Sequence, residues 1–367
     1  MHRPTHHKSR GALTNPASRF ADRHAVDFDD GWGSLEADPA AEPARPATHL
    51  HADPARRVIS RNDSPDVPFS ASINPYKGCS HGCIYCFARP THEYLDHSVG
   101  LDFETEIYYK SHAAERFEAE LRAPGYRCTP ITLGANTDPY QPDEKQLGVT
   151  RALLAVADRF NQPLSIVTKG ALITRDLDIL TRLAERNLVS VYMSVTSLDN
   201  AIKRTLEPRA ASPTQRLRAI TALHDAGVPV GALVAPIIPM ITDHELETLV
   251  ERVAAAGAES AGYVMLRLPH GIKHLFREWL AEHYPQRAEH VMSLINQMHG
   301  GRDYDSAWRT RMTGTGVYAE LIARRFRLAC RRAGLAERSG SRRRFALDTA
   351  CFSVPPAPGE QHTLDLG

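Results

Sequence analysis

The sequence predicts an α/β fold in which parallel strands alternate with helices and curl into a partial barrel. One observation is a series of short apolar runs, rich in β-branched residues, between residues 67 and 269, as expected of strands buried on both faces. The second is a helical stretch between one run and the next, which implies right-handed βαβ units. Roughly six or seven units are visible, fewer than the eight of a closed barrel, so we predict a partial (β/α)6-type TIM barrel over residues 67–269.

The elements of this barrel follow in chain order. We expect strands at residues 69–76, 104–110, 130–134, 164–168, 189–196, 228–235 and 263–268, and helices at residues 113–121, 150–160 and 176–186. Two later helices have start signals. Ser212 and Gln215 predict a capping box with proline at the first helical position, and Gly227 is placed to end that helix. Thr242 and Glu245 predict a second capping box.

The two ends of the chain differ from the barrel. Residues 1–66 lack a helical or alternating apolar pattern, and burial there would not offset the entropy of ordering, so we expect a largely disordered segment. Within it, residues 10–20 carry an apolar side chain every few positions and are expected to dock on the folded body. Beyond residue 269 the strands stop, and residues 270–352 predict a helical extension with helices at 274–284, 288–298 and 317–333. Residues 353–367 predict an irregular tail.

The composition excludes few classes of protein, but it indicates the compartment and therefore the chemistry of the cysteines. No run of about 18 apolar residues is present and residues 1–10 lack the apolar core of a signal peptide, so we expect a cytoplasmic protein without a membrane span. In a reducing compartment, clustered cysteines favour a metal or catalytic thiols over disulfides. The scattered Cys128, Cys330 and Cys351 are interpreted as small buried apolar residues.

Half of the six cysteines lie within eight residues, where Cys79, Cys83 and Cys86 form a C-x3-C-x2-C pattern. A 4Fe–4S cluster with only protein ligands needs four thiolates, so three leave one iron open. Glycines at 78 and 82 permit the backbone to wrap closely round such a group. The alternative is a nucleic-acid binding protein with a structural zinc at the same cysteines and His81 or His92 as fourth ligand, although no second ligand pair of the usual spacing follows. A non-catalytic iron–sulfur sensor is a further alternative.

Longer stretches carry a resemblance over residues 10–352. They are Asn74-Pro-Tyr-Lys-Gly-Cys-Ser-His-Gly-Cys-Ile-Tyr-Cys-Phe-Ala-Arg89, Asn136-Thr-Asp-Pro-Tyr-Gln-Pro-Asp-Glu-Lys145, Val167-Thr-Lys169 and Glu207-Pro-Arg209. The sequence resembles the radical S-adenosylmethionine (SAM) superfamily and, within it, the spore photoproduct lyase-like branch, also described as DNA repair photolyase-like. More narrowly, it is similar to a poorly characterised bacterial subgroup of that branch. The resemblance implies a 4Fe–4S cluster, SAM chelated at the open iron, reductive cleavage to a 5'-deoxyadenosyl radical, and an external electron donor of the flavodoxin or ferredoxin type.

The same resemblance implies roles for individual residues. It assigns the cluster to Cys79, Cys83 and Cys86, cofactor binding to Tyr85, Asn136, Thr137, Lys169, Ser194, Thr196 and Arg209, and catalysis to Asp138 and Lys169. We add Tyr140 as a candidate catalytic residue of our own. In particular, Lys169 pairs with the SAM carboxylate, Ser194 and Thr196 with the ribose, and Arg209 clamps a carboxylate or phosphate. Most of these side chains follow predicted strands, at the rim where barrel active sites lie. Each also has an ordinary structural alternative, such as a turn at Asp138 or Lys169.

One position departs from the resemblance. Spore photoproduct lyases carry a cysteine just ahead of the stretch that matches residues 136–138, and it returns a hydrogen atom to the substrate radical. Here that place holds Ala135 or Asn136, and Cys128 lies at the opposite end of the predicted strand. The resemblance therefore predicts the cofactor chemistry and not the lyase reaction, with Tyr140 as an alternative hydrogen or electron relay.

The helical extension is strongly basic. Residues 302–344 contain twelve Arg and no Lys against four acidic residues. Together with Trp308, Tyr318, Phe326 and Phe345, they suggest binding of a nucleic-acid backbone with stacking of its bases. The alternative is a solvated helix face whose aromatic residues belong to the core. Both interpretations remain open at this point.

Overall fold

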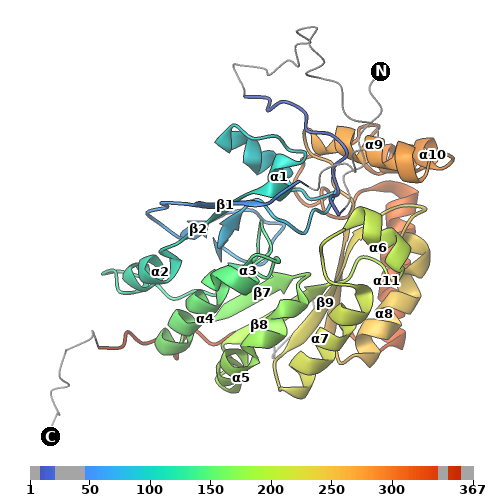
Figure 1. Ribbon diagram of the computed structural model, residues 1–367. Coiled ribbons are helices and arrows are strands. Elements are labelled where there is room, and N and C mark those ends of the chain that lie inside the picture. Colours follow the sequence, from blue (N-terminus) through green and yellow to red (C-terminus); the bar gives the residue numbers. More distant parts are fainter. Residues whose placement is uncertain (1–8, 21–45, 338–345, 357–367) are drawn as a thin grey trace, which may run out of the picture.

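The computed structural model describes residues 9–20, 46–337 and 346–356, and its centre is an eight-stranded sheet (Figure 1). Its order is β11-β10-β9-β8-β7-β6-β3-β2. The strands are β2 (Ile59–Arg61), β3 (Ala71–Ile73), β6 (Ile131–Leu133), β7 (Leu164–Thr168), β8 (Val189–Ser194), β9 (Val230–Ile237), β10 (Ser260–Met265) and β11 (Ala336–Glu337). All neighbouring strands are parallel except β2 and β3.

From β3 to β10 the sheet order follows the chain order, which confirms the predicted alternation of strands and helices. Within the described residues β2 and β11 are its two edges, so the sheet is open. Figure 1 shows α4 (Val149–Phe160), α5 (Leu177–Glu185), α7 (Pro213–Asp225) and α8 (Leu246–Ala255) along one side of it. Because the strands are parallel, their carboxyl ends meet at one edge, and residues that follow the strands lie close together there.

A second, smaller sheet carries the chain into the cysteine pattern. It joins β1 (His49–Ala52), β5 (Glu106–Tyr109) and β4 (Tyr76–Lys77) in the order β1-β5-β4. The strand expected at residues 104–110 is β5, which belongs to this sheet. The remaining short elements are η1 (Arg89–Leu95), α1 (Asp102–Thr105), α2 (Ala113–Leu121), α3 (Glu144–Leu147), η2 (Ala171–Asp176), α6 (Asn200–Leu206) and η3 (Asp243–Glu245).

The two predicted capping boxes have different outcomes. At the start of α7, Gln215 N donates to Ser212 Oγ at 3.3 Å and Ser212 N donates to Gln215 Oε1 at 2.9 Å, so this box is confirmed. The second is wrong. Thr242 Oγ1 accepts instead from Ile238 N at 2.9 Å, and the Glu245 carboxylate accepts from Ser197 Oγ at 2.6 Å. A nearby backbone N–H takes up the Thr242 hydroxyl and a tertiary partner takes up the Glu245 carboxylate, so the cap does not form.

The helical extension consists of α9 (Ile272–His283), α10 (Ala288–Met298) and α11 (Gly316–Arg332). The amino-terminal region is more ordered than expected, because β1, β2 and residues 9–20 all contact the folded body. Residues 1–8 and 21–45 lie outside the described part. Cys330 is buried as predicted, whereas Cys351 is exposed and Cys128 half-buried. No described helix is long and apolar enough to cross a membrane.

Candidate active site

The three clustered cysteines lie on a tight loop, residues 78–89, directly after β4. Internal backbone hydrogen bonds shape it, from Gly82 N to Cys79 O at 3.3 Å and from Cys86 N to Cys83 O at 3.2 Å. Gly78 and Gly82 have φ angles of 78° and 70°, in the left-handed region that favours glycine. Cys79 and Cys83 are each 7% exposed, and Cys86 is half-buried. We call residues 78–89 the cysteine loop.

Burial raises the pKa of Cys79, Cys83 and Cys86, so in the protein alone these groups are neutral thiols. A metal centre bound there would have to supply the positive charge that stabilises their thiolates. Three cysteine thiols on one short loop are the donor type that binds a 4Fe–4S cluster, in which each thiolate binds a different iron. The donor set therefore fits the cluster.

Asp138 follows β6 and ties the cysteine loop to the strand ends. Its carboxylate accepts hydrogen bonds from Thr168 Oγ1 at 2.6 Å and Lys169 N at 2.7 Å, and His81 Nδ1 lies 3.4 Å away. Burial alone raises the pKa of Asp138, but His81 and the hydrogen bonds from Thr168 and Lys169 lower it to about 2. Asp138 is therefore ionised and holds His81, in the cysteine loop, against the end of β7.

Its two neighbours are held by backbone contacts. Asn136 N donates to Asn74 Oδ1 at 2.8 Å, and the buried Thr137 Oγ1 donates to Tyr76 O at 2.7 Å. Both contacts join the end of β6 to the residues that lead into the cysteine loop. Asn136, Thr137 and Asp138 therefore all follow the end of β6, as predicted. The Thr137 hydroxyl donates its hydrogen bond to the protein backbone.

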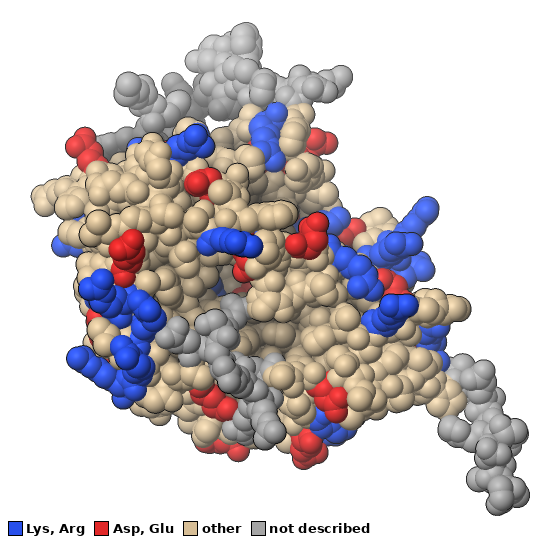
Figure 2. All heavy atoms as spheres, turned by 180° about the vertical axis from the view of Figure 1, so that it is seen from behind, with Lys and Arg blue, Asp and Glu red and all other residues tan. Residues whose placement is uncertain are grey.

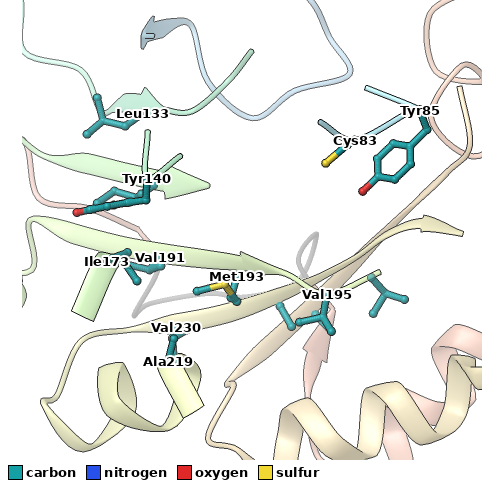
Figure 3. Packing of buried hydrophobic residues seen from close by; sticks show 14 of the residues in the cluster. Cys83, Tyr85, Leu133, Tyr140, Ile173, Val191, Met193, Val195, Ala219 and Val230 are labelled. Atoms are coloured by element: carbon teal, nitrogen blue, oxygen red, sulfur yellow. The ribbon is translucent and has the colours of Figure 1, made fainter. Parts of the chain in front are cut away.

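Lys169, Ser194 and Tyr85 come together from three segments. Lys169 Nζ donates to Ser194 Oγ at 2.9 Å and lies 5.8 Å from the centre of the Tyr85 ring. The charge of Lys169 acts on Cys83 and Cys86, where it opposes the effect of burial on the thiol pKa. Figure 3 shows Cys83 and Tyr85 beside each other, facing the strand that carries Met193 and leads to Val195. The arrangement sets an ammonium group beside the cysteine loop.

A buried acid–base pair fixes Tyr85. The Glu207 carboxylate accepts from the Tyr85 hydroxyl and from Thr196 Oγ1, the latter at 2.7 Å, and pairs with the Arg216 guanidinium. Burial raises the pKa of Glu207, but Arg216 and Lys169 lower it to about 2. Sequence reasoning gave no role to Glu207 or Arg216, although a glutamate within the matched stretch at 207–209 was a usable signal.

The side chains of Arg209 and Tyr140 do not join the group formed by Lys169, Ser194 and Tyr85. Arg209 Nη1 donates to Thr48 Oγ1 at 3.1 Å, and its backbone N donates to His81 O, in the cysteine loop, at 3.1 Å. Tyr140 is 1% exposed, and burial together with the nearby Asp176 raises its pKa. Figure 3 shows its hydroxyl turned away from Cys83.

A second charged pair, also missed from the sequence, supports the loop. Arg89 donates through Nε to Cys83 O at 2.9 Å and through Nη1 to Gly100 O at 2.8 Å, and it pairs with Glu104. Both side chains of this pair are 0% exposed. Because a buried charge without its partner is costly, the pair must form whenever the loop is folded.

A cavity of about 790 Å³ lies against one face of the sheet. Its lining includes polar residues of β6, β7 and β8, namely Thr132, Ser165, Ser190 and Tyr192, together with residues 65–69 and part of α11. Figure 2 shows the surface hollowed near the middle of the rear face. Because residues two apart along a strand point to the same face, this lining places the cavity on one face of the sheet.

Comparisons with known proteins agree with this architecture. Residues 73–253 match the radical SAM superfamily. An uncharacterised protein of Mycobacterium tuberculosis is 40% identical over 233 residues, which are 63% of this chain and 68% of that protein. An uncharacterised protein of Methanocaldococcus jannaschii is 26% identical over 191 residues, 52% of this chain and 68% of the relative.

The fold is similar to a solved structure, spore photoproduct lyase complexed with dinucleoside spore photoproduct, with a TM-score of 0.57 and 18% identity over 78% of this chain and 81% of that one. At this identity the likeness concerns the fold. Radical SAM enzymes use a 4Fe–4S cluster and SAM, and the donor set of the cysteine loop fits that cluster. The chain belongs to the radical SAM superfamily of enzymes.

Proposed function

We propose that Cys79, Cys83 and Cys86 each bind one iron of a 4Fe–4S cluster and that SAM occupies the fourth iron at the carboxyl ends of β6 to β9. One observation carries the proposal: three thiols lie on one short loop, two of them buried and one half-buried, and the Lys169 ammonium group acts on Cys83 and Cys86. Such a cluster supplies the electron that cleaves SAM and yields the 5'-deoxyadenosyl radical for hydrogen abstraction.

The protein's own residues then bind and orient SAM. Lys169, already within the reach of the cysteine loop, supplies a point charge for the SAM carboxylate. Tyr85, held by Glu207, fixes the loop backbone beside the adenine. Ser194 and Thr196 offer hydroxyls at the end of β8 for the ribose. Asp138 accepts a hydrogen bond from the backbone N–H of Lys169 and so orients it, and Arg209 is a clamp for an anionic group beside the loop.

Anaerobic reconstitution with iron, sulfide, SAM and dithionite tests this function, with release of 5'-deoxyadenosine as the readout. Cys83→Ala should abolish the release and lower bound iron, while Cys128→Ala, a half-buried cysteine outside the loop, should leave both unchanged. Wild-type protein that carries one equivalent of zinc and no sulfide would establish the structural zinc alternative instead. An assembled cluster that gives no 5'-deoxyadenosine would favour the sensor.

For the substrate we propose an anionic macromolecule, a nucleic acid, that docks on the helical extension. Four arginines of α11 are exposed, namely Arg324, Arg327, Arg331 and Arg332, and Figure 2 shows Lys and Arg side chains gathered on the side where α11 lies. Trp308 is 56% exposed, whereas Phe326 belongs to the core and Tyr318 donates to Asp243. Phe345 lies outside the described residues. These arginines support electrostatic docking more than stacking of bases.

Two further proposals concern the setting of the reaction. An external donor of the flavodoxin or ferredoxin type reduces the cluster, and the protein acts in the cytoplasm, where a reducing environment keeps the cysteine loop free of disulfides. Reconstituted enzyme incubated with deuterium-labelled candidate substrates would identify the substrate, because the true one transfers deuterium into 5'-deoxyadenosine. A labelled oligonucleotide that transfers none under turnover would contradict the nucleic-acid proposal.

A further inference from the structure

Residues 9–20, which we call the N-terminal strap, lie against the cysteine loop; in Figure 1 they are the dark blue segment near α1. The closest approach is between Gly11 and Gly82. A Cβ atom added at Gly11 would lie 1.9 Å from the Gly82 carbonyl oxygen, which is far inside van der Waals contact. Glycine is therefore required at position 11 for the strap to reach the loop backbone.

The Glu104 carboxylate joins the strap to the loop. It accepts hydrogen bonds from Gly11 N and Ala12 N, both at 2.9 Å, and pairs with Arg89. Arg89 in turn donates to the carbonyl of Cys83 at 2.9 Å. A Cβ atom at Gly82 would lie 2.6 Å from Glu104 Oε2, so this carboxylate also packs on the loop directly. Two residues, Glu104 and Arg89, therefore connect the strap to Cys83, a proposed cluster ligand.

Contacts along the strap anchor it to elements on either side of the loop. Arg10 donates to Glu104 O at 2.7 Å and to Thr48 Oγ1 at 2.9 Å. Thr14 Oγ1 donates to Glu278 in α9 at 2.7 Å, and Arg19 lies 3.1 Å from Glu93 in η1. Ala12 and Leu13 are buried. The strap is therefore held by specific contacts on α9 and η1 as well as beside the cysteine loop.

We propose that the N-terminal strap is a positioning element that holds the cysteine loop in its closed shape and keeps solvent reagents from its thiols. Gly11 and Arg10 act through Glu104 and Arg89 and touch no reacting atom. The inference rests on the proposed function only in that the protected group is the iron–sulfur cluster. The shape of the loop in the metal-free protein is measured separately.

Alkylation of the metal-free protein under reducing conditions tests the closed shape. The rate of N-ethylmaleimide labelling is followed by mass spectrometry for each cysteine in wild type, Gly11→Ala and Ala17→Ser. Ala17 is an exposed residue of the same strap, so Ala17→Ser is the matched control. Exposed Cys351 reports reagent activity, and Cys330, fully buried in α11, reports global unfolding.

In Gly11→Ala the cysteines of the loop should label about tenfold faster, because a lost contact of about 1.4 kcal/mol raises the open population by that factor. Cys330 and the control variant should stay at wild-type rates. Unchanged labelling of Cys79, Cys83 and Cys86 would overturn the proposal, and so would an equal rise at Cys330, which would mean that the strap only stabilises the fold. Should Gly11→Ala fail to fold, Arg10→Gln is the second variant. It removes the hydrogen bonds of the Arg10 guanidinium to Glu104 O and Thr48 Oγ1 without a backbone clash, and the same labelling rates are expected.

The loaded protein gives the second readout. After anaerobic reconstitution, iron transfer to a ferrous chelator should be about tenfold faster from Gly11→Ala than from wild type or Ala17→Ser. Equal rates would refute protection of the cluster. If wild type takes up no cluster, the proposed function fails while the alkylation result still decides the closed shape. If wild type is active and the labelling rates are equal, only the strap inference fails.

Discussion

Replacing Glu207 with glutamine removes the charge on which Tyr85 and Arg216 depend. The pKa of Glu207 lies at about 2 against an ordinary 4.5, because Arg216 and Lys169 outweigh the effect of burial. The difference corresponds to about 3 kcal/mol of stabilisation by the ionised carboxylate, and leaving Arg216 buried without its partner costs a similar amount. We therefore expect Glu207→Gln to lower the free energy of unfolding by about 3 kcal/mol at neutral pH.

The pH dependence follows from the same values. Since folding lowers the pKa of Glu207, its stabilisation is complete above about pH 4.5 and is lost as the pH falls toward 2. Urea unfolding of the metal-free protein between these pH values measures the effect. The acid-induced loss of stability should be smaller in Glu207→Gln than in wild type, because the variant has no carboxylate to protonate at this position.

Glu247→Gln is the matched control. Glu247 pairs with Arg325, but these side chains are 40% and 27% exposed, so solvent screens the pair and its loss should cost at most about 1 kcal/mol. The double variant Glu207→Gln, Arg216→Met should be more stable than the sum of the single effects, because no unpaired buried charge remains. If Glu207→Gln and Glu247→Gln lose equal stability, the assigned role of the buried pair is wrong.

Three further outcomes follow from the site. Lys169→Gln should weaken SAM binding to the reconstituted enzyme by about tenfold or more, and Lys169→Arg by less, because each 1.4 kcal/mol of lost charge pairing is a factor of ten in affinity. Equilibrium dialysis measures these affinities. Equal affinities in wild type and Lys169→Gln would exclude Lys169 as the partner of the SAM carboxylate. Asp138→Asn should reduce iron retention, because His81 loses its anionic partner; full retention would refute the tie between loop and strands. Replacing Arg324, Arg327, Arg331 and Arg332 by glutamine should reduce the salt dependence of oligonucleotide binding by up to about four phosphate contacts, and an unchanged slope would leave α11 as a solvated face.

Local patterns predicted what local interactions decide. The bounds of α2, α10 and β7 agree with the expected ranges, and the Ser212 cap forms because its partner Gln215 is only three residues away. The cap at Thr242 fails because Ile238 N and residues of the β8 end compete for the same side chains. Strand ends likewise placed Lys169 and Ser194 together, since parallel strands share one carboxyl edge.

Patterns in the sequence did not predict the contacts between segments that lie far apart in the chain. Glu104 and Arg89 are fifteen residues apart and adjoin the strap, whose contacts reach over more than ninety positions. Tyr140 follows a strand as expected, yet its ring turns into the core beside Asp176, because the direction of a side chain after a strand depends on the turn that follows. The exposure of Cys351 was missed for a similar reason: a lone cysteine carries no periodic signal of burial.

The central claim is that the cysteine loop holds a cluster with one iron open to SAM. Electron paramagnetic resonance of the reduced, reconstituted protein, recorded with and without SAM, tests it most directly. The account predicts a 4Fe–4S signal that changes on addition of SAM and is lost in Cys79→Ala, Cys83→Ala and Cys86→Ala. A cluster signal that is identical with and without SAM, or one that survives in these variants, would contradict it.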